Sequence, residues 1–220
     1  MILKKDQMDS VLITGGAGYI GSVLAEMLLD KGYEVTVLDN LLYKQTSLLH
    51  LCDNKFFTFI KGDVTNKVQL QALVVTHDII IPLAAIVGAP ACDANKDLAT
   101  SVNLHQIENI VDILETNQKL IMPNTNSQYG SSDKIITEES PFNPLSHYAK
   151  TKCEAEDYII DWENGICLRL ATVFGSSPRM RTDLLVNDFI YKTMTDGCLV
   201  LFQSHFKRNY IHVRDIARTF

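Results

Sequence analysis

The sequence predicts an α/β fold, a doubly wound parallel sheet of the Rossmann type. Three observations predict it. Short apolar runs alternate with segments whose apolar residues recur at helical spacing. A glycine-rich loop separates the first strand from the first helix, and polar residues follow several strand ends. Parallel strands joined by right-handed crossovers would bring those polar ends to one edge of the sheet, where ligands bind.

Each element is justified by its local pattern. β-rich or apolar runs predict strands at 11–13, 33–38, 56–60, 79–81, 120–122 and 166–170. Helical spacing predicts helices at 19–31, 68–75, 98–114 and 146–161. Later elements are a helix at 182–195, strands at 199–202 and 210–213, and a helix opening at 215–220. Because no Gly, Pro or polar turn closes this last helix, we expect the chain to be truncated at its C-terminus.

The composition excludes several classes of partner. Of 220 residues, 46% are hydrophobic and 21% charged, and the formal net charge is -6, which argues against a nucleic-acid surface. No apolar run approaches the ~18 residues of a membrane span, and no signal peptide is visible. The five cysteines are far apart without a CxxC pair, so we expect a cytoplasmic protein with reduced thiols and no metal site.

The loop TGGAGYIG lies between the first strand and the first helix. Gly15 would permit the tight turn, Gly18 would let a pyrophosphate approach the backbone, and Gly21 would allow close helix packing. The candidate dinucleotide contacts of this loop are Gly15, Gly18, Tyr19, Ile20 and Gly21. The alternative is a glycine-rich turn that binds nothing.

Asp39 lies at the end of the second strand, 18 residues beyond Gly21. A carboxylate there can accept hydrogen bonds from both ribose hydroxyls and would repel a 2′-phosphate, and the closest cation is Lys44. NAD is therefore preferred to NADP. Asp63 and Val64 follow the third strand and either hold the adenine edge or form a plain turn.

The polar stretch NTNSQYG at 124–130 follows the apolar strand predicted at 120–122. Tyr148 and Lys152, four positions apart, share one face of a later helix. A phenol titrates near ~10, but a nearby ammonium and the charge of oxidised nicotinamide would lower its pKa. Tyr148 could then remove a hydroxyl proton while hydride leaves the same carbon for NAD, with Thr125 fixing the reacting oxygen. The alternative is a solvated helix face and a polar turn.

With these motifs together, the chain resembles the extended short-chain dehydrogenases, the family of the nucleotide-sugar epimerases and dehydratases. The resemblance rests on TGGAGYIG, LDN at 38–40, GDV at 62–64, PLAA at 82–85, NTNSQYG, SHYAKTKCEAE and RNYIHVRDIA at 208–217. The stretch LRLATVFGSSPRMRTDLLVNDF at 168–189 is similar to bacterial GDP-heptose 4-dehydrogenases. Residues 1–175 would form the NAD-binding Rossmann domain. Residues 176–220 would begin a small substrate-binding region, with the last strand and helix returning to the Rossmann sheet.

The resemblance implies roles for individual positions. Thr125, Tyr148 and Lys152 would be catalytic, and the last two would also contact the cofactor. Further cofactor contacts would come from Asn40, Leu83, Ala84, Ala85 and Asn103. Substrate contacts to a nucleotide-diphosphate sugar would come from Thr125, Asn126, Asn187 and Arg208.

The chain departs from the family pattern at two kinds of position. Thr172 stands where many members carry Asn, so sugar contacts there would differ. Dehydratases carry an Asp-Glu pair after the catalytic Thr, whereas this chain has Asn126 and Ser127, so 4,6-dehydration is not expected.

The predicted reaction is oxidation of the sugar C4 hydroxyl, as a 4-epimerase or a dehydrogenase. A non-catalytic dinucleotide-binding module is the alternative, and a homodimer through helices 98–114 and 146–161 is expected from the resemblance.

Overall fold

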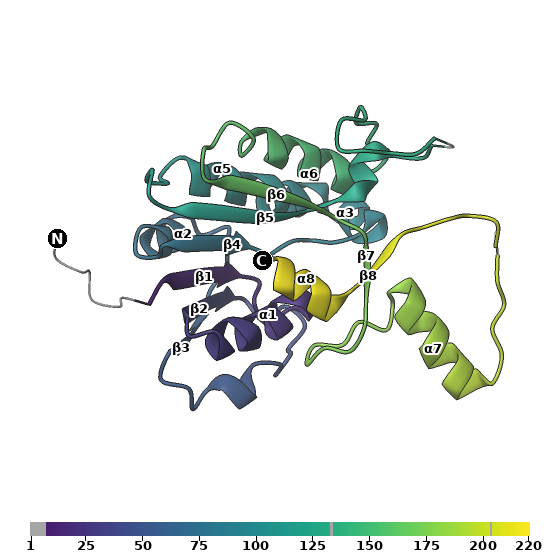
Figure 1. The fold of residues 1–220 in the computed structure, drawn as a ribbon, viewed down its shortest axis with the longest axis horizontal. Helices are drawn as coiled ribbons and strands as arrows, with labels where there is room; N and C mark the ends of the chain where they lie inside the picture. Colours follow the sequence, from purple (N-terminus) through teal and green to yellow (C-terminus); the bar gives the residue numbers. More distant parts are fainter. Residues whose placement is uncertain (1–7, 133, 203) are drawn as a thin grey trace.

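A computed structural model describes residues 8–132, 134–202 and 204–220. Its centre is a six-stranded sheet with the order β3-β2-β1-β4-β5-β6, in which every neighbouring pair is parallel (Figure 1). The strands are β1 (Ser10–Thr14), β2 (Glu34–Asp39), β3 (Phe57–Lys61), β4 (Ile79–Pro82), β5 (Lys119–Thr125) and β6 (Gly165–Leu170). The doubly wound fold predicted from the sequence is confirmed.

Helices cover both faces of this sheet. The helices before β6 are α1 (Tyr19–Asp30), α2 (Lys67–Val74), α3 (Ala89–Ala94), α4 (Lys96–Thr100), α5 (Gln106–Val111) and α6 (His147–Asp157). A π-helical turn, Ser101–His105, makes α4 and α5 one continuous helix, so the helix expected at 98–114 starts earlier and ends earlier. Short 3₁₀ turns lie at Leu49–Leu51 (η1) and at Asn126–Tyr129 (η3).

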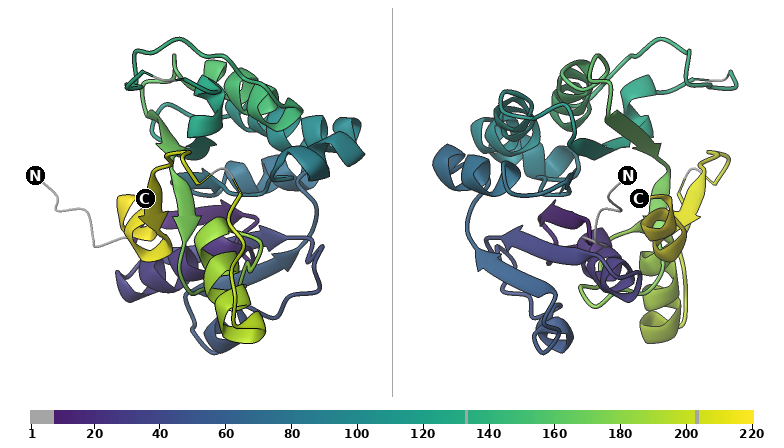
Figure 2. Two further views of the ribbon diagram at one scale, coloured as in Figure 1. Left: turned by 90° about the vertical axis from the view of Figure 1, so that its right-hand side faces the viewer. Right: turned by 60° about the vertical axis from the view of Figure 1, so that its left-hand side comes forward.

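The alternation of side chains along β1 explains the two layers. Val11 and Ile13 face a core shared with α1, whereas Leu12 faces a core shared with α2, α5 and α6. Successive residues of a strand point to opposite faces, so a strand buried on both faces needs an uninterrupted apolar run. Figure 2 shows the resulting helix–sheet–helix sandwich from two further directions.

The strand order reverses between β1 and β4, which gives the sheet a topological switch point. From β1 the chain builds outward to β2 and β3 on one side, and then crosses to β4, β5 and β6 on the other. At such a point the loops that leave neighbouring strands separate, and a crevice opens beyond the carboxyl ends of the strands. The candidate site lies there.

The region after β6 differs from the prediction. It contains β7 (Thr172–Phe174), α7 (Leu185–Asp196), β8 (Tyr210–His212) and α8 (Val213–Thr219). β8 pairs with β7 in a separate two-stranded sheet, so the expectation that the last strand returns to the Rossmann sheet is wrong. The last helix does return, because Val213 and Ala217 of α8 share the core of α1 and β1.

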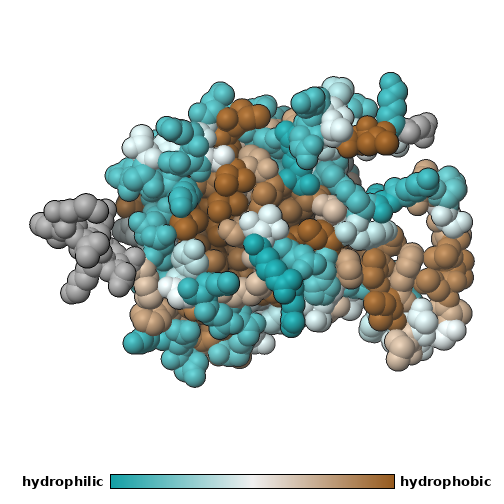
Figure 3. All heavy atoms as spheres, in the orientation of Figure 1, coloured by the Kyte–Doolittle hydropathy of each residue, from teal (hydrophilic) through white to brown (hydrophobic). Residues whose placement is uncertain are grey.

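The strand predicted at 199–202 is also wrong. This apolar run has no regular structure, and Val200, Leu201 and Phe202 are exposed. Figure 3 shows apolar atoms at the surface in the part of the molecule where Figure 1 labels α7. A short apolar run becomes a strand only where another strand offers hydrogen-bond partners, and its sequence does not show whether one is present. None of the helices in the described part of the chain could span a lipid bilayer.

Candidate active site

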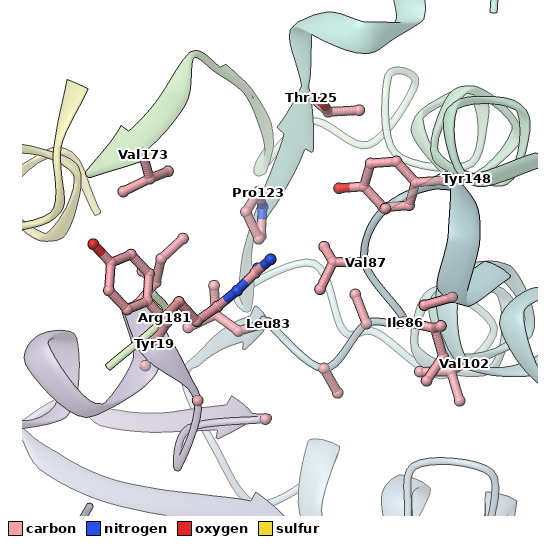
Figure 4. A pocket seen from close by; sticks show the side chains of 18 of the residues that line it. Tyr19, Leu83, Ile86, Val87, Val102, Pro123, Thr125, Tyr148, Val173 and Arg181 are labelled. Atoms are coloured by element: carbon pink, nitrogen blue, oxygen red, sulfur yellow. The ribbon is translucent and has the colours of Figure 1, made fainter. Parts of the chain in front are cut away.

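A cavity of about 830 Å³ occupies the crevice at the switch point. Its walls come from the glycine loop, from the ends of β2, β4 and β5, from α6 and from residues 179–184. Figure 4 shows Tyr19 and Leu83 on one side of this space and Thr125 and Tyr148 on the other. Most of the predicted site residues are therefore brought together around one cavity, which has the size of a cofactor site.

The glycine loop is shaped by close backbone contacts. Gly15 has a φ of +68°, and a Cβ atom added to it would lie 2.5 Å from the backbone nitrogen of Ala84. A Cβ atom on Gly21 would lie 2.5 Å from Cα of Gly16. The loop can thus lie flat against the end of β4 only without side chains, which leaves the N-terminus of α1 open to a phosphate group.

Asp39 joins the glycine loop to the end of β2. Its carboxylate accepts hydrogen bonds from the backbone nitrogens of Ala17 (3.0 Å) and Leu41 (2.8 Å), and from Nε2 of Gln45 (3.3 Å). Burial raises its pKa, and the two backbone hydrogen bonds oppose that shift. Asp39 also lines the cavity, where its remaining acceptor positions suit ribose hydroxyls.

Asn40 and Asp63 form the far end of this wall. Asn40 Nδ2 donates to Asp63 Oδ2 at 2.8 Å, and Thr65 donates to the other carboxylate oxygen. Burial would raise the pKa of Asp63, but these hydrogen bonds together hold it below its ordinary value. Val64, Leu83, Ala84 and Ala85 also line the cavity, as expected for cofactor contacts.

Thr125, Tyr148 and Lys152 form the opposite wall. Thr125 ends β5 and caps η3 by accepting a hydrogen bond from the backbone nitrogen of Ser127 at 3.2 Å. Ser146 caps α6 in the same way, and so fixes the helical turn that carries Tyr148. The phenol oxygen of Tyr148 points into the cavity, with Thr125 on the same side (Figure 4). Lys152 follows one turn later and is 4% exposed.

Burial dominates the electrostatics of Tyr148 and Lys152 on this wall. Burial raises the pKa of Tyr148 to about 12, and the nearby Cys92 thiol acts in the same direction, while Arg181 and the Thr125 hydroxyl oppose the shift. Burial lowers the pKa of Lys152 to about 8, and Cys167 and Glu156 oppose that shift. In the protein alone burial dominates, and Arg181 is the cation that lowers the pKa of Tyr148. The acidifying effect predicted for Lys152 together with oxidised nicotinamide stays a prediction.

Two predicted contacts lie outside the cavity wall. Asn103 is 1% exposed, and its amide accepts from the backbone nitrogen of Ile86 (2.8 Å) and donates to the carbonyl of Ile86 (3.0 Å). It holds the loop after β4 and does not reach the cavity. Asn187 is 4% exposed and bonds to the Gly175 backbone nitrogen, the Tyr19 hydroxyl and the Arg181 carbonyl. Asn103 and Asn187 thus hold loops in place. The cofactor contact predicted for Asn103 and the diphosphate contact predicted for Asn187 stay predictions.

The two remaining substrate candidates do line the cavity. Arg208 is an exposed residue shortly before β8, and Asn126 follows directly after Thr125. Asn126 Nδ2 donates to Oδ1 of Asn209 at 2.8 Å. This contact joins the end of β5 to the segment that carries Arg208, although 83 residues separate the two partners.

Sequence reasoning missed Arg181. Its side chain extends into the middle of the cavity toward the side that carries Tyr148 (Figure 4). It forms an ion pair with Asp183, with Nε–Oδ1 at 3.1 Å and Nη2–Oδ2 at 2.5 Å. The pair of arginines in SPRMRTD could have indicated an anion site, but only the fold shows that the second arginine faces the phenol.

The fold and the site together define an enzyme of the short-chain dehydrogenase type. Residues 11–220 match the sequence model of the NAD dependent epimerase/dehydratase family, and the chain belongs to that family. The family, the enzyme class and the NAD cofactor predicted from the sequence are confirmed.

Similar proteins extend this picture. The chain is 29% identical to the uncharacterized UDP-glucose epimerase YtcB of Bacillus subtilis, over 94% of this chain and 70% of that protein. It is 32% identical to UDP-arabinose 4-epimerase 1 of Arabidopsis thaliana, over 78% of this chain but only 44% of that protein. A solved UDP-glucuronic acid 4-epimerase from Bacillus cereus, in complex with UDP-glucuronic acid and NAD, has a TM-score of 0.82 at 28% identity, over 95% of this chain and 71% of that one.

Proposed function

We propose that the protein acts on a nucleoside-diphosphate sugar, oxidises its C4 hydroxyl with NAD, and returns the hydride to the other face as a 4-epimerase. One observation carries this proposal. The Tyr148 phenol and the Thr125 hydroxyl face the same cavity that the glycine loop and Asp39 line from the opposite wall. A sugar carbon held between these walls would meet a proton acceptor and the cofactor together.

The chain's own residues fit a dinucleotide. A side chain on Gly15 would clash with the backbone at Ala84, and Asp39 presents a carboxylate at the ribose end of the cavity. The glycine loop and the N-terminus of α1 would bind the pyrophosphate, and Lys152 would hold the nicotinamide ribose. Bound NAD would supply the hydride acceptor.

The proton steps belong to Tyr148. In the protein alone its pKa of about 12 keeps the phenol protonated, so it needs a positive field before it can act as a base. Arg181 already supplies part of that field. Thr125 would bind the sugar oxygen and hold it beside the phenol. Asn126 and Ser127 are not acids, so these two positions offer no group that would protonate a leaving hydroxyl at C6.

Relatives favour UDP as the nucleotide. The names of similar proteins include UDP-glucose, UDP-arabinose and UDP-glucuronic acid 4-epimerases. The GDP-heptose substrate suggested by residues 168–189 therefore stays a prediction, to be compared directly with UDP sugars.

A substrate panel tests the proposal. The protein would be incubated with NAD and with UDP-glucose, UDP-N-acetylglucosamine, UDP-glucuronic acid, UDP-arabinose or a GDP-linked manno-heptose, and the product stereochemistry followed by proton NMR. We expect inversion at C4 of at least one sugar, and no inversion with Tyr148→Phe. Calorimetric binding of NAD without turnover of any sugar nucleotide would contradict the proposal and favour a non-catalytic module.

The expected homodimer and cytoplasmic location remain predictions. Size-exclusion chromatography with light scattering would test the dimer, and fractionation of cells that express the protein at natural levels would test the location.

A further inference from the structure

A buried carboxylate lies behind the catalytic wall. Glu156 follows Lys152 by one turn of α6, is 2% exposed and does not line the cavity. Its Oε1 accepts hydrogen bonds from Arg169 on β6, through Nε at 2.9 Å and Nη2 at 2.5 Å. Its Oε2 accepts from Gln128 Nε2 at 3.0 Å and from Asn124 Nδ2. Three polar side chains from β5, η3 and β6 therefore converge on one carboxylate.

Arg169 forms an ion pair with this carboxylate and is itself held in place. Its Nη1 donates to the hydroxyl of Tyr129 at 2.7 Å and to the carbonyl of Glu138 at 2.8 Å. The guanidinium also lies 4.7 Å from the ring centroid of Phe142. A buried ion pair is tolerated when its other hydrogen bonds are also satisfied, and removing one partner leaves a costly buried charge.

The same network reaches the catalytic residues through Asn124. Asn124 Nδ2 also donates to the backbone carbonyl of Lys152 at 3.2 Å, and its Oδ1 accepts from the backbone nitrogen of Thr125 at 2.9 Å. Glu156 thus fixes the side chain that joins the last residue of β5 to the turn of α6 that carries Lys152. A substitution at Glu156 would therefore change the positions of Thr125 and Lys152 through Asn124, although Glu156 forms no hydrogen bond with the side chain of either residue.

The charges around Lys152 give Glu156 a second role. Glu156 follows Lys152 by four positions on α6 and Tyr148 precedes it by four, so the three side chains share one face of the helix, and the charge of Glu156 raises the pKa of Lys152. From β6 it is faced by Cys167, with Arg169 beyond Glu156. Cys92 of α3 lies on the Tyr148 side of this group. Among these groups Glu156 is the carboxylate, and it favours the ammonium form of a lysine that burial disfavours.

We propose that Glu156 is a positioning residue of the active site. Its carboxylate holds the Thr125 strand end through Asn124 and supplies the negative charge that keeps Lys152 an ammonium ion. Arg169 sets the strength of that charge. This role rests on the proposed function only in its effect on turnover, because the protonation of Lys152 can be measured without any substrate.

The test is a pH titration of Lys152 by NMR in protein with isotope-labelled lysine, with the resonance assigned from Lys152→Arg. In Glu156→Gln we expect the pKa of Lys152 to fall by about one unit, because an amide keeps the shape but lacks the charge. In Arg169→Gln the unscreened carboxylate should raise the pKa of Lys152 by about one unit.

The sign of the shift separates this role from a purely structural one. Loosened packing would admit water and raise the pKa of Lys152 in both variants, so an unchanged or raised value in folded Glu156→Gln overturns the proposal. If either single variant fails to fold, the double variant Glu156→Gln/Arg169→Gln removes both charges, and a lowered pKa is expected there too. An unchanged or raised value in the double variant would equally overturn it.

Turnover gives a second readout. The alkaline limb of the kcat/KM profile should move to lower pH in Glu156→Gln and to higher pH in Arg169→Gln. If Lys152 shifts as expected but no sugar is turned over by any form of the protein, the proposed function fails and the role of Glu156 stands. If sugar is turned over and Lys152 does not shift, the role of Glu156 fails alone.

Discussion

The two walls of the cavity are built by different means. The wall from β1, β2 and β4 is shaped by backbone packing, because the glycine loop lies against Ala84 without side chains between them. The wall from β5, α6 and β6 is made of side chains, because Thr125 and Lys152 are held by the buried network of Asn124, Glu156 and Arg169. The first wall is suited to bind NAD, and the second to control the protonation of Tyr148 and Lys152.

A buried carboxylate belongs to each side of the cavity, and the two differ in their hydrogen-bond donors and in their access to the cavity. Asp39 receives its hydrogen bonds from the neutral donors Ala17, Leu41 and Gln45, and it still lines the cavity. Glu156 is paired with Arg169 and closed off from the cavity. A carboxylate that must bind a ligand keeps acceptor positions open, whereas one that acts through its charge is enclosed. Changes to the two walls should therefore differ in kind.

The largest effect is expected on the side-chain wall. Tyr148→Phe removes the only phenol oxygen that points from α6 into the cavity in the described part of the chain. Turnover should fall by roughly 10³-fold, as for the loss of a general base, while NAD affinity measured by calorimetry stays near that of the parent. A matched loss of NAD affinity would show that the phenol only shapes the cofactor site.

Lys152→Met should reveal the stability cost of a buried ammonium. The folded-state pKa of Lys152, about 8, is below the ordinary value of 10.5, so the unfolded chain binds more protons between these pH values and stability rises with pH across that window. Below pH 8 the free energy of unfolding of Lys152→Met should be about 3 kcal/mol larger than that of the parent. This difference should shrink to zero as the pH approaches 10.5.

Urea unfolding at several pH values measures this difference, and the exposed Lys150→Met on the same helix is the control. Turnover should be lost in Lys152→Met despite its greater stability. A variant that is less stable than the parent at neutral pH would mean that hydrogen bonding by the ammonium outweighs its burial.

Adding one methyl group to the glycine loop should lower both the stability of the protein and its affinity for NAD. Gly15 and Gly32 both have positive φ angles, +68° and +86°, so Ala is strained at either position. Only at Gly15 would the new Cβ meet backbone, whereas nothing lies within 4 Å at Gly32. We expect Gly15→Ala to cost about 2 kcal/mol more than Gly32→Ala and to weaken NAD binding. Equal costs and equal NAD affinities would show that the close approach to Ala84 is unimportant.

The smallest effect concerns the contact between the glycine loop and residues 175–187. The Tyr19 hydroxyl donates to the Gly175 carbonyl at 2.6 Å and accepts from Asn187 at 3.2 Å. Tyr19→Phe should lower the free energy of unfolding by about 1 kcal/mol, the value of one hydrogen bond, and Tyr33→Phe is the matched control. A loss of sugar binding without a loss of stability would mean instead that the hydroxyl contacts the substrate.

The sequence was most informative where structure is local. The strand–loop–helix unit from Val11 to Asp39 was predicted because the glycine spacing and the apolar period lie within thirty consecutive positions or so. The apolar run at 199–202 was mistaken for a strand, since only tertiary context decides whether such a run finds a partner. Arg181 and Glu156 are missed for the same reason: Arg181 acts on Tyr148 and Glu156 on Asn124, and in each pair the two residues are more than 30 positions apart.

The central claim is that Tyr148 removes the proton of the sugar C4 hydroxyl while hydride leaves C4 for NAD. The most direct measurement is a rapid-mixing experiment that follows NADH absorbance after the NAD-loaded protein meets a UDP sugar carrying deuterium at C4. We predict transient NADH whose formation is slowed by the deuterium and is slower by roughly 10³-fold in Tyr148→Phe. NADH formation that is insensitive to deuterium at C4, or that is as fast without the phenol, would contradict the claim.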